Sequence, residues 1–432
     1  MTQPRLVFPQ SLNDPPITDI AAAYQKIRGL TRHLTTPLEI EDFVIQSGPE
    51  ASPPKWHLGH TTWFFETFIL QAFVPGYTVF HPQFQTLFNS YYESVSPYFP
   101  RQQRGTLSRP TVHQVIQYRE AVDAQVLEWI NAAPAEQWPR LVELIGWGLQ
   151  HEQQHQELLM MDILANFAAN PMAPAYAPQP TKQPTTSSTP LQWLAIPEGR
   201  TLQGHGDQGF AFDNERPRHA TWLTAARIAN RPVTNGEFLQ FLEDGGYQAP
   251  EFWLSDGWQW VQEGHSHPRY WSQVGSQWFQ FTLSGRIPLD PNASVVHVSY
   301  FEADAYARWH GARLIREEEW EWAATHLPTT DGPFLDDEQF VQTPAVFQPG
   351  HLLQALGGVW EWTQSAYRPY PGYRAPEGML AEYNGKFMNN QYVLRGGCAV
   401  TPKSHVRPTY RNFFHPSDTW QLAGIRLAED AE

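Results

Sequence analysis

The chain has 432 residues, more than the roughly 250–300 at which a single hydrophobic core stops growing, so two domains are expected. Its 29 Lys and Arg against 44 Asp and Glu give a net charge of −15, which repels phosphate backbones and argues against a nucleic-acid partner. Cys398 is the only cysteine, so no intrachain disulfide can form. The N-terminus lacks the features of a secretion signal and no apolar run is long enough to span a membrane, so we expect a cytoplasmic protein without membrane association.

Helical periodicity dominates the first part of the chain. It predicts long helices at about residues 17–34, 55–73, 110–132 and 139–168. Pro110 and Pro139 lie near the starts of the last two, where proline is well tolerated. Four such helices predict a four-helix bundle over residues 1–169.

A change of composition separates this bundle from the rest of the chain. Residues 170–190 are rich in Pro, Thr and Ser and lose the apolar periodicity, which predicts an extended linker. Residues 191–432 read as short strands and Gly- and Trp-rich loops, with helical runs near 234–243 and 300–324. The fold class expected is therefore α+β with several domains.

The segment HEQQH on the fourth predicted helix carries two candidate metal ligands, His151 and His155. Residues four apart lie on the same side of a helix, one turn apart, so both imidazoles can reach one ion. Both continue an apolar face and should point into the bundle, where metal sites of helical bundles are built. A pair of hydrogen-bonded core histidines is the alternative.

The letters HEQQH also fit the HExxH pattern of zinc metalloproteases, but the rest of that pattern is absent. The residues that follow are QELLMMDIL, without the downstream Gly and His, and Glu157 projects about 200° away from His155. A better third ligand is His60 in KWHLGHTTWFFE, which shares one helix side with Trp56 and Trp63. His57 lies about 60° from His60 around that helix, so it either supports a ligand or lies on the surface.

Three neutral imidazoles suit zinc, copper, nickel or iron, so the ligand type leaves the metal open. They also leave the +2 charge uncompensated and, in an octahedral ion, three positions open. An anionic thiolate and O2 could fill those positions. This favours oxidative thiol chemistry at Fe(II), while hydrolysis at zinc stays possible.

Larger blocks of the sequence resemble a known family. WHLGHTTWFFE followed by HEQQHQE resembles the N-terminal DinB-like domain of the sulfoxide synthases of ergothioneine biosynthesis. The second half resembles the formylglycine-generating-enzyme fold, a C-type-lectin-like module, in IPEGRTLQGH, FDNERPRH, RPVTNGEFLQFLEDGGY, GGVWEWTQS, RGGC and YRNFF. The resemblance implies a DinB-like four-helix bundle at 1–169 that carries the metal site, the linker at 170–190 and a formylglycine-generating-enzyme-like domain at 191–432.

The resemblance also implies an O2-dependent nonheme Fe(II) enzyme. Such an enzyme joins the sulfur of cysteine or γ-glutamylcysteine to C2 of the imidazole of Nα-trimethylhistidine (hercynine) and yields a sulfoxide. Iron ligation carries over onto His60, His151 and His155.

Residues for the two substrates carry over from the same resemblance. Gln154 matches a glutamine that hydrogen-bonds the hercynine imidazole, and Asn412 matches a residue that holds its carboxylate region. Phe413 could present an aromatic face to the trimethylammonium group. Arg101 and Arg104, in FPRQQRG, match the arginines that grip the carboxylate of the thiol substrate. Ordinary helix, loop and solvated-surface roles are the alternatives for these residues.

Two features distinguish the chain from the γ-glutamylcysteine branch of the family. Phe414 replaces an acidic residue that meets the glutamyl ammonium, so free cysteine is the expected thiol. Tyr91 and Tyr92, in NSYYES, lie in the same connecting region as the arginines, and we expect one of them to donate a proton that steers the reaction toward C–S bond formation. Aromatic packing over the mouth of the bundle is their alternative role.

Other functions remain to be separated by experiment. Formylglycine generation needs paired active-site cysteines, and Cys398 stands alone. Gly358 replaces a frequent Asn, which makes a structural calcium at that loop doubtful. An ovothiol-type synthase acting on unmethylated histidine, a zinc-dependent thiol transferase and a noncatalytic lectin-like binding protein remain alternatives, and the sequence leaves open whether the protein is a homo-oligomer.

Overall fold

The computed structural model describes residues 20–178 and 189–431. The chain divides into two compact units. Unit 1 runs to Tyr176 and includes the short segments Gln208–Phe210 and Glu377–Glu382, and unit 2 comprises Ala177–Asp207, Ala211–Pro376 and Tyr383–Glu432. The expected linker at 170–190 falls partly outside the described residues, at 179–188.

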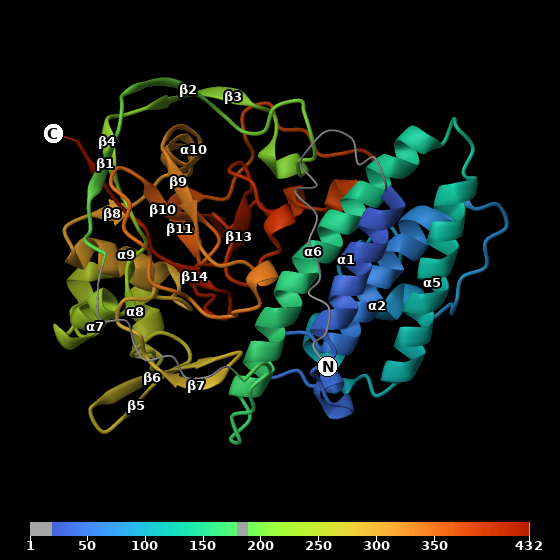
Figure 1. Cartoon of the computed structure of the whole chain (residues 1–432), viewed down its shortest axis with the longest axis horizontal. Coiled ribbons are helices and arrows are strands. Elements are labelled where there is room, and N and C mark those ends of the chain that lie inside the picture. The colour runs from blue at the N-terminus through green and yellow to red at the C-terminus, as the bar shows by residue number, and fades with distance from the viewer. Residues whose placement is uncertain (1–19, 179–188, 432) are drawn as a thin grey trace. The chain divides into compact units, whose positions relative to one another are not determined.

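Unit 1 is built on four long helices that lie side by side (Figure 1). They are α1 (Ile20–Leu34), α2 (Pro54–Phe65), α5 (Val112–Ala132) and α6 (Trp138–Ala168). The shorter helices of this unit are α3 (Gln71–Phe73) and α4 (Phe84–Leu87), and the segment Arg101–Thr106 forms a 3₁₀ helix. The four-helix bundle predicted from periodicity is therefore confirmed.

The starts of these helices follow from local sequence. Pro54 is the first residue of α2 and Pro139 stands in the first turn of α6, positions where a missing N–H costs nothing. Thr111 caps α5: its side chain accepts a hydrogen bond from the backbone N–H of Gln114, and the Gln114 side chain in turn accepts one from the backbone N–H of Thr111.

The helix expected at 55–73 is interrupted by a π-helical turn at Glu66–Leu70. The Glu66 carboxylate is fully buried and accepts hydrogen bonds from the hydroxyls of Tyr118 at 2.6 Å and Tyr77 at 2.8 Å and from the backbone N–H of Phe80 at 2.7 Å. A buried carboxylate needs such donors. They tie the chain that follows α3 back onto the bundle.

A second buried carboxylate, Glu152 on α6, joins three helices. It accepts hydrogen bonds from Arg119 on α5 at 2.5 Å and from Arg28 and Thr31 on α1 at 2.8 and 2.6 Å. Burial alone would raise the pKa of Glu152, but the two guanidinium groups outweigh that effect and hold it at about 2. These bonds fix the rotation of α6 within the bundle. They therefore also fix the direction of the neighbouring residue His151.

Unit 2 contains short helices and several small sheets. The helices are α7 (Asn235–Glu243), α8 (Ser255–Gln262), α9 (Tyr300–Trp309) and α10 (Glu317–His326). The strands are β1 (Trp193–Ile196), β2 (Gly199–Gln203), β3 (His219–Leu223), β4 (Ala226–Ala229), β5 (Trp271–Val274), β6 (Gln277–Thr282), β7 (Gly285–Pro288), β8 (Arg313–Leu314), β9 (Thr329–Asp331), β10 (Leu352–Leu356), β11 (Trp360–Ala366), β12 (Tyr392–Arg395), β13 (Asn412–Phe414), β14 (Ala423–Gly424) and β15 (Leu427–Asp430).

The described strands form two four-stranded sheets, ordered β1-β4-β15-β8 and β13-β12-β11-β14, together with a three-stranded sheet and two strand pairs. Strand β13 pairs antiparallel with β12, so that Phe414 faces Tyr392 and Asn412 faces Leu394 in the register. Buried ion pairs brace this unit. The Arg426 guanidinium bonds Glu361 at 2.6 Å, and both side chains are fully buried.

The second half differs from its predicted helices in two places. The run expected at 300–324 consists of two helices, α9 and α10, separated by β8, because Gly311 adopts a positive φ of 77° that ends α9. Helix α8 was not predicted, because its eight residues span only about two helical turns, too few for the periodicity to stand out. The prediction at 234–243 is confirmed by α7.

Within the described ranges, none of the helices combines the length and the apolarity that a membrane span requires.

Candidate metal centre

Three histidines meet inside unit 1, as predicted. His60 comes from α2, and His151 and His155 come from two successive turns of α6. Each offers a ligand nitrogen, and the three nitrogens all lie within 4.8 Å of one another. His60 and His151 are buried, with 1% and 3% of their surface exposed, and His155 is half-buried. We call these three residues the histidine tripod.

Hydrogen bonds and distances aim Nε2 of His60 and His151 at the same point. His60 donates its Nδ1–H to the backbone carbonyl of Phe88 at 2.6 Å, which leaves the lone pair on Nε2. That Nε2 lies 3.1 Å from Nε2 of His151. Two nitrogens bound at right angles to one ion by bonds of about 2.1 Å lie about 3.0 Å apart. The donor atoms therefore fit a single divalent ion.

The environment keeps the tripod neutral, which is the form that binds metal. Burial lowers the pKa of His151 to about 3. Burial and the neighbouring His151 place the pKa of His60 well below its usual value, and burial together with His60 and His151 does the same for His155. All three imidazoles are therefore unprotonated at neutral pH and available as ligands.

Aromatic rings surround the tripod. The Trp56 ring stacks on His60 with centroids 4.6 Å apart, and Trp63 stacks on the same imidazole at 5.6 Å. Phe64 packs against His151 at 4.7 Å. These walls are apolar, so charged groups at the site interact more strongly than they would in water.

His57 is buried, with 2% of its surface exposed, so the surface position that the sequence left open is excluded. Its Nδ1 lies 2.9 Å from Nδ1 of His155. Its Nε2 lies 2.9 Å from the carboxylate of Asp162, which is also buried.

The two candidate arginines differ in their surroundings. Arg104 is buried with 4% of its surface exposed, and its guanidinium carbon lies 3.3 Å from the ring centroid of Trp56. One of its terminal nitrogens donates to the hydroxyl of Ser52 at 3.0 Å, and among the described residues its Nε has no hydrogen-bond partner. Arg101 is exposed and donates to the backbone carbonyl of Glu50. The structure thus brings Arg104, and not Arg101, into contact with the tripod's aromatic wall.

The candidate tyrosines lie beside the same wall. Tyr92 is fully buried and packs against Trp63 at 5.5 Å, and Tyr91 stacks on Tyr92 at 4.7 Å and is half-buried. Asn89 holds this segment: its amide donates to the Tyr92 carbonyl at 3.0 Å, and the Tyr92 N–H donates to its side-chain oxygen at 3.0 Å. Gln154 is half-buried on α6, directly before His155.

The candidates Asn412, Phe413 and Phe414 lie on β13 of unit 2, so the fold of the bundle does not position them. The side-chain oxygen of Asn412 accepts a hydrogen bond from the Phe413 N–H at 2.9 Å. Phe413 stacks on Tyr367 at 4.1 Å, and Phe414 packs edge-on against Trp420 at 5.1 Å.

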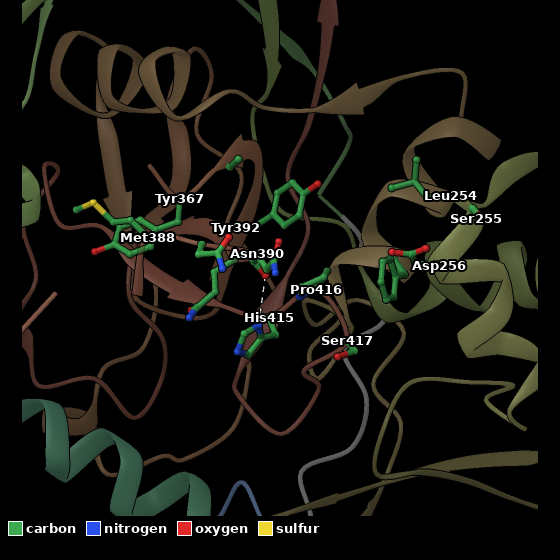
Figure 2. A pocket seen from close by; sticks show the side chains of 14 residues that line it. Leu254, Ser255, Asp256, Tyr367, Met388, Asn390, Tyr392, His415, Pro416 and Ser417 are labelled. Atoms are coloured by element: carbon green, nitrogen blue, oxygen red, sulfur yellow. Dashed lines mark hydrogen bonds between the residues drawn. The ribbon is translucent and has the colours of Figure 1, made fainter. Parts of the chain in front are cut away.

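Unit 2 has a cavity of about 900 Å³ next to this strand. Figure 2 shows Tyr367 and Met388 at one side of it, Asp256 at the other, and His415 between them, with Nδ1 of His415 3.3 Å from the Asn390 carbonyl. Its volume is in the range of small-molecule sites. Because Tyr367 both lines the cavity and stacks on Phe413, β13 borders it.

Sequence reasoning missed Asp162, Glu152 and the Phe88 carbonyl. Asp162 follows His155 by seven residues, two helical turns, so an acidic residue on the ligand face of α6 was a usable signal. Glu152 and the Phe88 carbonyl gave no comparable signal, because their partners come from other helices and loops.

Comparisons with known proteins agree with this architecture. Residues 23–159 match the DinB superfamily, and residues 177–344 and 335–431 match the sulfatase-modifying factor enzyme 1-like domain. The chain is also 27% identical to the formylglycine-generating enzyme of Streptomyces coelicolor, over 55% of this chain and 89% of that protein.

Other relatives cover both units. The chain is 32% identical to the hercynine oxygenase of Mycobacterium tuberculosis, over 93% of this chain and 97% of the relative. It is 30% identical to the hercynine oxygenase of Mycolicibacterium thermoresistibile, over 90% of this chain and 89% of the relative. The chain therefore belongs to the hercynine oxygenase family of O2-dependent oxidoreductases.

Proposed function

We propose that this protein is a nonheme iron(II) sulfoxide synthase of ergothioneine biosynthesis. It joins the sulfur of cysteine to C2 of the imidazole of hercynine and produces hercynylcysteine sulfoxide. The observation that carries the proposal is the histidine tripod, inside a chain that aligns with hercynine oxygenases over nearly its whole length. One C–H and one S–H bond break, a C–S and an S–O bond form, and O2 accepts four electrons, with its second oxygen leaving as water.

Iron(II) held by His60, His151 and His155 would supply the redox chemistry with O2 and a binding position for the thiolate. The tripod contributes no negative charge, because its three imidazoles are neutral. An anionic thiolate is therefore favoured over a neutral thiol at this centre, and the aromatic wall of Trp56, Trp63 and Phe64 limits the access of water.

The thiol substrate carries a carboxylate, and we assign its binding to Arg104. The support is the buried guanidinium on Trp56, which in turn stacks on His60, together with a buried Nε that has no hydrogen-bond partner within residues 20–178 and 189–431. A charge-assisted hydrogen bond to a carboxylate would satisfy this donor. Arg101, engaged with the Glu50 carbonyl, serves as a second and weaker cation.

Hercynine binding is assigned to Gln154, Asn412 and Phe413. Gln154, which precedes His155 on α6, would hold the imidazole with its amide. Asn412 would hold the carboxylate, and the ring of Phe413 would attract the trimethylammonium group. The stacking of Phe413 on Tyr367 supports this role, since it fixes the orientation of the ring.

Free cysteine is the proposed thiol because Phe414 offers no carboxylate to form an ion pair with an ammonium group. Burying the glutamyl ammonium of γ-glutamylcysteine without a partner is costly. We further propose that the hydroxyl of Tyr91 or Tyr92 donates a proton during C–S bond formation. The contact of Tyr92 with Trp63, which stacks on His60, supports a position near the reacting atoms.

The test is mass spectrometry of aerobic reactions with the iron-loaded protein and hercynine, supplied with cysteine in one reaction and γ-glutamylcysteine in another. We expect hercynylcysteine sulfoxide, formed faster than its γ-glutamyl counterpart. Unmethylated histidine in place of hercynine tests the ovothiol-type alternative. Oxygen uptake with cysteine sulfinate as the sole product would refute the coupling reaction, and an absence of oxygen uptake would refute the redox function.

A further inference from the structure

His57 and Asp162 form a continuous hydrogen-bonded chain with one member of the tripod. The His155 Nδ1 lies 2.9 Å from Nδ1 of His57, and the His57 Nε2 lies 2.9 Å from Oδ2 of Asp162. The same carboxylate oxygen accepts the backbone N–H of Ser52 at 2.7 Å. His57 and Asp162 are 2% and 1% exposed, so water does not compete for these bonds.

The spacing of these residues along their helices explains how the hydrogen-bonded chain forms. His57 precedes His60 by three residues on α2, and Asp162 follows His155 by seven residues on α6. Both spacings keep the residues on one side of their helix and move them along it by one or two turns. The hydrogen-bonded chain therefore crosses between α2 and α6, and His155 is its end in the tripod.

The donors and acceptors in this hydrogen-bonded chain have only one consistent arrangement when Asp162 is ionised and His57 is neutral. A carboxylate only accepts, so His57 donates its Nε2–H to Asp162. Neutral His57 then has its lone pair on Nδ1 and accepts the Nδ1–H of His155. His155 is thereby left with its lone pair on Nε2, the nitrogen that His60 and His151 also present.

We infer that Asp162 and His57 are positioning residues that fix the tautomer and orientation of His155 as a metal ligand. The inference rests on the metal centre of the proposed function. His60 is held by a neutral carbonyl, that of Phe88, whereas His155 is held through His57 by a negative charge. Partners of this kind raise the basicity of a ligand imidazole. The tripod is therefore asymmetric, with His155 a stronger donor than His60.

The first measurement uses the metal-free full-length protein and needs no activity. Long-range ¹⁵N–¹H correlation spectra of protein labelled at histidine report which ring nitrogen carries the proton. We expect Nδ1–H with a bare Nε2 for His155, and Nε2–H with a bare Nδ1 for His57. The opposite tautomer of His155 would overturn the inference.

The second measurement is the affinity for Zn(II) and Co(II) in competition with a chelator. Asp162→Asn keeps an acceptor but removes the charge. His57→Gln keeps an acceptor for the His155 N–H, and His57→Phe removes it. We expect affinity to fall about 10-fold in the first two variants and up to about 100-fold in His57→Phe, with a changed Co(II) spectrum.

Asp123→Asn is the matched control, because Asp123 is a carboxylate of the same bundle that bonds Arg28 at 2.7 Å and Tyr24 at 2.7 Å. It should change metal affinity less than about twofold. If His57→Phe and His57→Gln bind metal as tightly as the unaltered protein, the positioning role is refuted. If the unaltered protein and His60→Gln bind metal equally weakly, the metal centre itself fails, which is a distinguishable result.

Discussion

The guanidinium carbon of Arg104 lies 3.3 Å from the ring centroid of Trp56, and the same ring stacks on His60 at 4.6 Å. A cation, an indole and an imidazole of the histidine tripod thus stack on one another inside the bundle. Burial and the neighbouring Arg101 place the pKa of Arg104 well below its ordinary value, which reflects the cost of holding this charge without a carboxylate. A substrate carboxylate would offset that cost.

The first prediction concerns this arginine. Arg104→Lys should raise KM for cysteine about 10–100-fold, because a charge-assisted hydrogen bond contributes about 1.5–3 kcal/mol and lysine cannot reproduce the flat stack on Trp56. Steady-state kinetics with cysteine and hercynine varied in turn should show the change in KM for cysteine alone.

Arg101→Lys is the control for this experiment. The Arg101 guanidinium is exposed and donates to the Glu50 carbonyl, so KM for cysteine should change less than about threefold. Equal effects of both substitutions would contradict the assignment of the carboxylate to Arg104.

The second prediction concerns the tyrosine hydroxyls. Tyr91→Phe and Tyr92→Phe each remove one hydroxyl and keep the ring, and we expect one of the two to divert product from the coupled sulfoxide to cysteine sulfinate. The two products can be counted by mass spectrometry against the oxygen consumed. Tyr176→Phe, which removes a buried hydroxyl bonded to the Leu34 carbonyl, should leave the ratio unchanged. An unchanged ratio in both test variants would assign the pair to packing alone.

The third prediction concerns the choice of thiol. Phe414→Asp should raise kcat/KM for γ-glutamylcysteine relative to cysteine by about three- to tenfold, because it supplies a carboxylate for the glutamyl ammonium. Phe414→Leu removes the ring packed on Trp420 without adding charge and should not change the ratio. Competition between the two thiols in one reaction measures the ratio directly.

The fourth prediction concerns the pH dependence of stability. Glu152 has a pKa of about 2 in the folded protein, against an ordinary value of 4.5. As the pH falls below about 4.5, Glu152 is protonated in the unfolded chain before it is protonated in the folded protein. The contribution of its carboxylate to the free energy of unfolding is therefore complete above pH 4.5 and is lost progressively toward pH 2.

Glu152→Gln should therefore lower the free energy of unfolding of the bundle by about 3–5 kcal/mol at pH 7, because it removes the anionic partner of Arg119 and leaves Arg28 with Asp123 alone. Hydrogen exchange of the α6 amides measures this local stability. The difference in free energy of unfolding between the unaltered protein and Glu152→Gln should become smaller as the pH falls from 4.5 to 2. A gap that stays constant over that range would show that the ion pairs do not stabilise the bundle.

Much of the fold could be predicted from periodicity and capping. Four helices of unit 1 and α7 of unit 2 lie where their patterns place them, because an apolar stripe and a cap are local properties of the sequence. The interruption of the second helix at Glu66 and the break before β8 could not be predicted in the same way. At the first, Glu66 is bonded by hydroxyls of Tyr77, in the segment after α3, and of Tyr118, on α5, and helical periodicity reports neither contact.

The candidate site likewise combines features that could be predicted from the sequence with features that could not. The shared helix side of His151 and His155 could be predicted from their spacing alone, because the 3.6-residue turn sets the angle between positions four apart. The meeting of His60 with this pair, the contacts of His57 with both Asp162 and His155, and the burial of Arg104 but not of Arg101 are seen only in the folded structure. Helical spacing fixes directions along one element, whereas the rotation of α2 against α6 and the path of the loop between α2 and α5 follow from packing and buried hydrogen bonds across the whole bundle.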